Sequence, residues 1–129
     1  MKKIINLLAT CVLAICLTNC APTADSLIEK VIKLEKIGKD ENEIKQIEAN
    51  FTAEAKAQFK KALEAACNED DFKKIDSVLD CIASAGELNA KAQDDQAKKA
   101  AQEASKKCAE LPKPEKACSD FMKSLATKK

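Results

Sequence analysis

The sequence contains no histidine, arginine, tryptophan or tyrosine, and its four aromatic residues are all phenylalanines. Histidine is the commonest general base and the usual partner of a nucleophilic serine or cysteine, so its absence argues against acid–base and nucleophilic catalysis. The absence of arginine removes the planar group that binds phosphate or carboxylate through two hydrogen bonds. Aromatic faces for stacking on bases or sugars are also scarce. We therefore expect neither an enzyme nor a nucleotide-binding protein.

Glycine and proline are rare, with two and three residues, whereas alanine, lysine and glutamate are abundant. This composition is typical of helices rather than sheets and predicts an all-α fold. The chain has 22 basic and 21 acidic residues. Binding to nucleic acid requires concentrated positive charge that releases counterions, so this balance predicts no nucleic-acid partner.

The N-terminal segment has a basic start at Lys2 and Lys3, an apolar run from Ile4 to Leu17, and then Cys20. A run of about 14 residues is too short to cross a hydrocarbon core comfortably, and no basic stop-transfer flank follows it. This order is typical of a bacterial lipoprotein signal peptide. We expect residues 1–19 to be removed and Cys20 to carry fatty acyl groups such as palmitate on its sulfur and amine.

Asn19 departs from the small residue that usually precedes a lipidated cysteine, so two alternatives stay open. One is a plain secretory signal, which residues 19–21 fit poorly because its cleavage needs an A-x-A-like pattern; the other is an uncleaved anchor. In the lipoprotein interpretation, residues 20–25 form a short tether and residues 26–129 form one domain close to the membrane. Ala21 makes the outer membrane the default destination, on its periplasmic face or at the cell surface.

With Asn19 before Cys20 and a lysine-rich composition that includes a few later cysteines, the chain resembles small spirochaete-type (Leptospira-like) lipoproteins. The signals of those proteins accept asparagine before the cysteine, and their mature part is helical. The resemblance covers the signal and the overall composition only. It implies a location in the cell envelope, and it implies no activity because most such proteins have none assigned.

Apolar residues recur at helical spacing in successive segments of the remaining chain. These segments are 26–37, 40–51, 52–67, 69–86, 87–111 and 114–125. Short connections between amphipathic helices favour antiparallel neighbours, so we predict a small antiparallel bundle of four to five helices. Residues 87–111 carry mostly alanine on their apolar face and therefore predict the weakest part of the core.

The residue types at the segment ends fit helix caps. The expected starts are Ser26 with Glu29, Asp40 with Glu43, Thr52, Asn68 and Pro114, and the expected ends are Gly38 and Gly86. The four phenylalanines are predicted to anchor the core: Phe51, Phe59, Phe72 and Phe121. The acidic pairs Asp70/Asp71 and Asp94/Asp95 are interpreted as caps or surface charge, because adjacent acids point to different faces of a helix.

The seven cysteines fall into three groups. Cys11 and Cys16 lie in the segment that is expected to be removed, and Cys20 is the expected lipid acceptor. The other four are Cys67, Cys81, Cys108 and Cys118. An even number outside the cytoplasm predicts two disulfides rather than free thiols. A metal site is disfavoured because histidine and paired C-x-x-C spacing are both absent, and no cofactor is expected.

Geometry narrows the three possible pairings. Bridged Cα atoms lie within about 7 Å of one another, whereas Cys81 stands roughly 18 Å along a helix that begins after Cys67. The complementary bridge from Cys108 to Cys118 would nevertheless close the turn at Pro112. We favour bridges between the two halves, and two arrangements stay open: Cys67–Cys118 with Cys81–Cys108, or Cys67–Cys108 with Cys81–Cys118.

Two functional hypotheses follow. The first is a membrane-anchored structural or interaction module that binds an unidentified protein partner through its helices. The second is a carrier of a small apolar ligand, held between loosely packed helices near residues 87–111. A large exposed apolar patch would favour the first hypothesis, and an enclosed cavity would favour the second.

Overall fold

The computed structural model describes residues 21–126, which form six helices and no strands, so the all-α prediction is confirmed. The helices are α2 (Ala24–Lys36), α3 (Glu41–Asn50), α4 (Ala53–Ala66), α5 (Glu69–Lys91), α6 (Asp95–Cys108) and α7 (Lys116–Ala126). The described chain therefore has six helices where the sequence predicts a bundle of four to five. The short helices α3 and α7 are each distinct from their neighbours in the chain.

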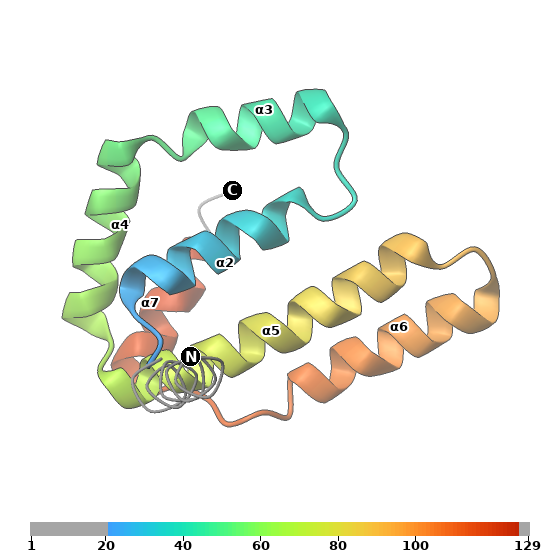
Figure 1. The fold of residues 1–129 in the computed structure, drawn as a ribbon. Coiled ribbons are helices and arrows are strands. Elements are labelled where there is room, and N and C mark those ends of the chain that lie inside the picture. The colour runs from blue at the N-terminus through green and yellow to red at the C-terminus, as the bar shows by residue number, and fades with distance from the viewer. Residues whose placement is uncertain (1–20, 127–129) are drawn as a thin grey trace, which may run out of the picture.

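Figure 1 shows the arrangement of these helices. The first three, α2, α3 and α4, follow three sides of an open frame, and α7 lies behind α2. The long helix α5 passes beneath the frame and forms an antiparallel hairpin with α6. The outer half of this hairpin projects away from the other helices as an arm.

Most helix starts lie where the sequence predicts them. Asp40 and Glu43 form a capping box at the start of α3, and Thr52 caps α4 by accepting the backbone N–H of Ala55. Asn68 caps α5. Each cap satisfies backbone donors that the first turn of a helix leaves unpaired.

The start of α2 differs from the prediction. Thr23, rather than Ser26, is the N-cap, and Ser26 occupies the third helical position of the capping box. The hydroxyl of Thr23 accepts the N–H of Ser26 at 3.2 Å, and the hydroxyl of Ser26 accepts the N–H of Thr23 at 2.9 Å. The earlier start brings Ala24 into the helix, where it is buried in the core.

The two glycines behave differently. Gly38 follows the end of α2 with a φ of +72°, as the sequence predicts for a helix end. Gly86 does not end a helix, because α5 continues through it to Lys91. The connection to α6 instead falls at residues 92–94, with Asp94 as the N-cap. The segment predicted at 87–111 is therefore divided between α5 and α6.

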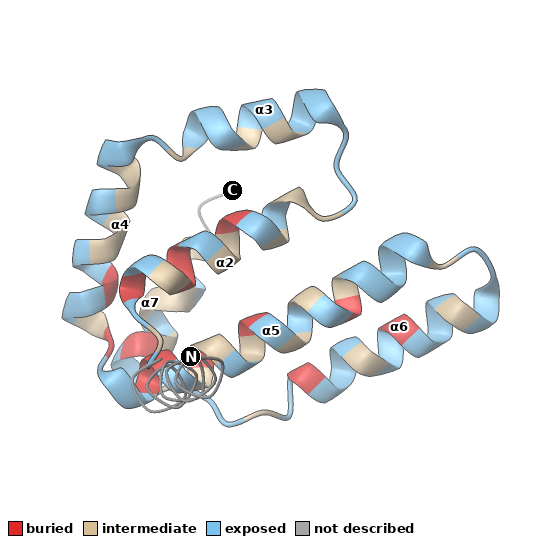
Figure 2. Cartoon of the chain, in the orientation of Figure 1, coloured by how far each residue is buried: buried red, intermediate tan, exposed pale blue. Residues whose placement is uncertain are grey.

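The core lies where α2, α4, α5 and α7 meet. Its buried residues are Ala24, Leu27, Leu63, Cys67, Phe72, Ile75, Leu79 and Cys118. Figure 2 shows this concentration of buried residues at one end of the molecule, whereas α3 has no buried residue. Phe72 is buried, and Phe59 and Phe121 pack against the core with their ring centroids 6.1 Å apart. Phe51 is only half-buried, at the end of α3.

Candidate interaction surface

Two disulfides connect the halves of the chain. Cys67, directly after α4, pairs with Cys118 in α7, and their Cα atoms are 4.7 Å apart. Cys81 in α5 pairs with Cys108 at the end of α6, with Cα atoms 5.6 Å apart. This is the first of the two arrangements that the sequence leaves open. The antiparallel packing of α6 on α5 decides it, because that packing brings Cys108 beside Cys81.

These bridges enclose long stretches of chain, with sequence separations of 51 and 27 residues. In the chain-entropy description, each would stabilise the fold by about 4 kcal/mol by restricting the unfolded chain. That is a large contribution against a typical total of roughly 5 to 15 kcal/mol. Together they hold α5, α6 and α7 to the rest of the domain and define the surfaces between those helices.

Asp71 is the buried charged residue of the described chain, with only 1% of its surface exposed. One carboxylate oxygen accepts the backbone N–H of Asn68 at 3.1 Å, and the other accepts the N–H of Glu115 at 2.6 Å. The carboxylate therefore lies at the N-terminal ends of both α5 and α7, where the helix dipoles favour a negative charge. It joins the start of α7 to the start of α5.

The sequence reveals only part of this role. The spacing of Asn68 and Asp71 fits a capping box, and the structure contains one there. Nothing in the sequence indicates that Asp71 is buried or that it binds a backbone group 44 residues away. Its neighbour Asp70 is exposed and pairs with Lys74 at 2.8 Å, as expected for a surface charge.

A second polar link joins α2 to α5. The ammonium group of Lys30 lies 2.5 Å from Asp76 and 2.7 Å from Asp80, which are one turn apart on α5. Burial lowers the pKa of Lys30, but hydrogen bonds and charge attraction to the two carboxylates outweigh this effect and hold the pKa above its ordinary value. This link joins α5 to α2 at the surface, beside their apolar contact.

An apolar groove runs between α5 and α7. It has a volume of about 330 Å³ and opens to solvent, with Ser119 and Lys123 at its edge. Its apolar lining consists of Ile75, Val78, Leu79, Ile82, Pro114 and Met122. Two large apolar side chains stay exposed among the described residues: Ile82 at 43% and Leu88 at 53%. Ile82 lies in the groove, whereas Leu88 lies on the arm outside it.

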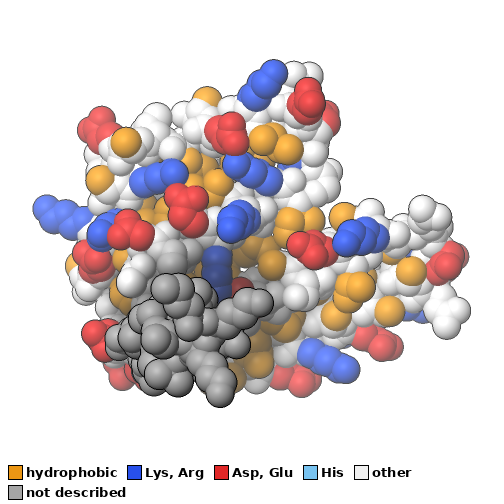
Figure 3. Space-filling view, in the orientation of Figure 1, with side chains coloured by type: hydrophobic (Ala, Val, Ile, Leu, Met, Phe, Trp, Pro, Cys, Tyr) orange, Lys and Arg blue, Asp and Glu red, His pale blue; other side chains and the backbone are white. Residues whose placement is uncertain are grey.

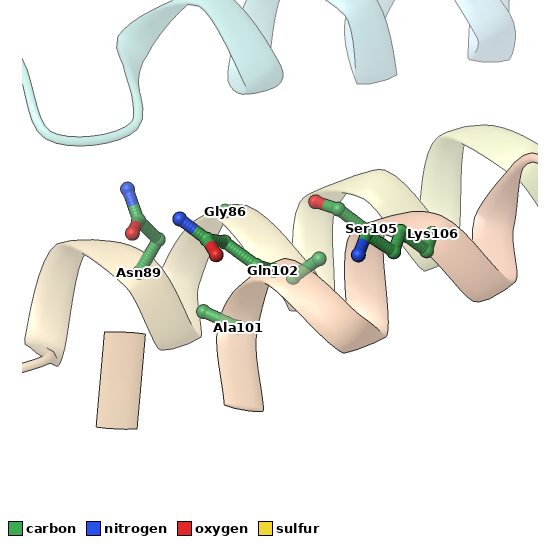
Figure 4. Close-up of a pocket in the computed structure, with 7 residues that line it drawn as sticks. Gly86, Asn89, Ala101, Gln102, Ser105 and Lys106 are labelled. Atoms are coloured by element: carbon green, nitrogen blue, oxygen red, sulfur yellow. The ribbon is translucent and has the colours of Figure 1, made fainter. Parts of the chain in front are cut away.

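A separate hollow lies over the seam between α5 and α6, in the region where the sequence suggests a ligand cavity. It has a volume of about 450 Å³ and is open to solvent. Small residues form its floor, and Figure 4 shows Asn89, Gln102 and Ser105 projecting to the same side of the two helices. It is therefore a shallow, partly polar depression rather than an enclosed apolar cavity.

Charged side chains of both signs cover the outer surface. On the face shown in Figure 3, lysines and acidic residues are interspersed, and neither sign forms a continuous patch. Several pairs link neighbouring helices, including Lys56 with Glu29 at 3.0 Å and Lys60 with Asp25 at 2.6 Å. Residues 1–20, which include Cys11, Cys16 and Cys20, lie outside the described residues.

Within residues 21–126, no group of three or more histidine, cysteine, aspartate or glutamate side chains is placed to hold a metal ion. None of the helices in this part of the chain is long and apolar enough to cross a membrane. The chain matches no known protein family, no curated protein and no solved structure.

Proposed function

We propose that this protein is a lipoprotein of the bacterial cell envelope, anchored through Cys20, whose helical domain binds a protein partner. The observation that carries the binding role is the open apolar groove between α5 and α7, with Ile82 exposed within it. Exposing apolar surface to water is unfavourable, and a groove of this kind accepts the apolar face of a partner helix.

The location is supported by separate observations. The order of basic residues, apolar run and Cys20 is that of a lipoprotein signal, and two disulfides are typical of proteins outside the cytoplasm. The described domain begins its first helix at Ala24, a few residues after Cys20. A tether this short would hold the domain close to the membrane, with the outer membrane as the proposed site.

The anchor is tested by intact mass of the protein extracted from its native membrane with detergent. We expect a mass that corresponds to a chain beginning at an acylated Cys20, and four hydrogens lighter before reduction because two disulfides are present. The matched variant Cys20→Ser should lose the acyl mass and move to the soluble fraction. An unacylated native chain would contradict the proposal.

The binding role is tested with a photo-crosslinking amino acid placed at position 82 or at position 88 in cells. Both positions hold exposed, large apolar side chains on α5, so they differ mainly in whether they lie in the groove. We expect a discrete crosslinked protein from position 82 and none from position 88. Equal crosslinking from both positions, or none from position 82, would overturn the assignment of the groove.

A carrier of a small apolar ligand is the second candidate: the same groove is open rather than enclosed, but its volume fits a small ligand. Ligand sites occupy about 300 to 1,000 Å³, and the groove lies at the lower end of that range. Native mass spectrometry of protein from its own membrane distinguishes the two roles. A carrier would retain a small molecule that is lost in Met122→Lys, whereas a docking groove would carry none.

A further inference from the structure

Helix α6 is attached to the rest of the molecule mainly through α5. It packs on α5, and its buried residues are Ala101 and Cys108. Within the described chain, the ion pair formed by α6 joins Lys98 to Asp95 inside the helix itself. The seam along α5 is long, but each of its alanine side chains buries little surface. The Cys81–Cys108 bridge is the covalent link that adds to this packing.

The second bridge has different surroundings. Cys118 is fully buried and Cys67 nearly so, and both belong to the core cluster with Leu63, Phe72 and Ile75. Asp71 also holds the start of α7 through Glu115, independently of the sulfur atoms. In the Cys81–Cys108 bridge, Cys108 is also buried, but Cys81 is only half-buried. Thiol–disulfide exchange requires access to a sulfur atom, so the two bridges differ in their exposure to a reductant.

We propose that the Cys81–Cys108 disulfide is a reversible redox latch that holds α6 on α5, whereas Cys67–Cys118 is a permanent structural bridge. The reductant is a dithiol. One of its thiolates attacks the sulfur of Cys81, forming a mixed disulfide while Cys108 leaves as a thiolate and takes up a proton. The second thiol of the reductant then displaces Cys81, which also becomes a thiol, and the reductant leaves as a disulfide. Two electrons and two protons are transferred in total.

Opening this latch changes the surface of α5. Ala85, which is almost fully buried under α6, becomes accessible beside Gly86 and one turn from Ile82. The apolar surface that begins in the α5–α7 groove then extends along α5 into the arm. The body of the domain is retained, because its core residues lie on α2, α4, α5 and α7 and at Cys67. The latch does not depend on lipidation of Cys20.

The test is graded reduction of the full disulfide-bonded protein with dithiothreitol under native conditions, followed by alkylation of free thiols. Cleavage after lysine places each of the four cysteines in a separate peptide, so each thiol is counted by mass spectrometry. We expect Cys81 and Cys108 to be labelled about ten-fold faster than Cys67 and Cys118, because Cys81 is the only one of the four cysteines that is half-buried rather than buried, and attack on Cys81 frees both thiols. Oxidised dithiothreitol should restore the bridge.

Hydrogen exchange of the same samples tests the conformational change. After selective reduction, amides of α6 should lose protection, while those of α2 and of the first half of α5 keep theirs. The double variant Cys81→Ser/Cys108→Ser should reproduce this pattern without reductant, and Cys67→Ser/Cys118→Ser should instead loosen α7. Equal labelling of both bridges, earlier labelling of Cys67 and Cys118, or a protected α6 after reduction would each overturn the proposal.

Discussion

At the scale of single residues, Asp71 shows how one side chain connects distant parts of the chain. Its carboxylate accepts two backbone N–H groups, from Asn68 and from Glu115, and it is shielded from water. A carboxylate is an acceptor at both oxygens, and this is the property that the site uses. An amide of the same shape has one acceptor oxygen and one donor nitrogen.

The substitution Asp71→Asn should therefore lower the free energy of unfolding by about 1 to 3 kcal/mol, because its amide nitrogen would face a backbone N–H that is left unpaired. Urea unfolding followed by circular dichroism measures this loss. The matched control is Asp70→Asn, which alters the adjacent exposed residue and should change the unfolding midpoint much less. Similar losses for both variants would contradict the role of the buried contact.

The two glycines give a second comparison at this scale, with opposite expected signs. Gly38→Ala places a side chain at a φ of +72°, which costs about 1 to 2 kcal/mol although nothing crowds the added atom. Gly86→Ala lies within α5, where alanine is favoured by roughly 1 kcal/mol and its Cβ would lie 3.5 Å from Ile37, an ordinary contact. Thermal unfolding should show a lower midpoint for the first variant and a higher one for the second. A shift in the same direction for both would show that packing, not backbone conformation, controls these sites.

At the scale of helices, α5 and α3 differ most in length and in how far they are buried. Helix α5 has 23 residues and packs against both α2 and α6, whereas α3 has 10 residues, none of them buried. The link from α3 to α2 includes an exposed ion pair, Lys36 with Glu48 at 2.7 Å. Such pairs contribute little to stability, so α3 should open locally while the rest of the domain stays folded.

Removing equivalent caps from the two helices tests this difference. Asp40→Ala and Asn68→Ala each delete an N-cap side chain, a change that typically costs about 1 kcal/mol. We expect Asp40→Ala to speed hydrogen exchange within α3 without changing the global unfolding midpoint, and Asn68→Ala to lower that midpoint. If Asp40→Ala lowered the global midpoint equally, α3 would be an integral part of the cooperative unit.

At the scale of the whole molecule, stability should change little between about pH 5 and 9, because the chain has no histidine to titrate there. Lys36 and Lys74 hold the pKa values of Glu48 and Asp70 below their ordinary values through hydrogen bonds and charge attraction. The stability that these acids contribute is present above their unfolded pKa values and is lost as the pH falls through their folded values.

At alkaline pH the lysine partners make stability depend on pH in the opposite direction. Hydrogen bonds to Asp25 and Asp70 raise the pKa values of Lys60 and Lys74 above 10.5, so their contributions are full below that pH and are lost as the pH rises through the folded values. Unfolding midpoints in urea, measured from pH 3 to 11 on the disulfide-bonded protein, should therefore form a plateau with a fall at each end. Added salt should flatten both falls, because these pairs are exposed. A step near pH 6 to 7 would contradict this description.

The local features were largely predictable from the sequence, because they depend on neighbouring residues. Helical periodicity, the caps at Asp40, Thr52 and Asn68, and the turn at Gly38 all follow from backbone preferences and hydrogen bonds within a few positions. Gly86 was misleading for a related reason. A lone glycine costs a helix only about 1 kcal/mol, which the packing of α5 readily offsets.

The sequence by itself determined that this chain folds as helices and that its four later cysteines are suited to bridges between the two halves. Only the tertiary structure decided which of the two remaining cysteine pairings forms, because that depends on how α6 lies along α5. The burial of Asp71 against Glu115 and the groove between α5 and α7 were decided in the same way. Both arise from contacts between residues that are far apart in the chain, and no local pattern records which distant segment will pack beside a given helix.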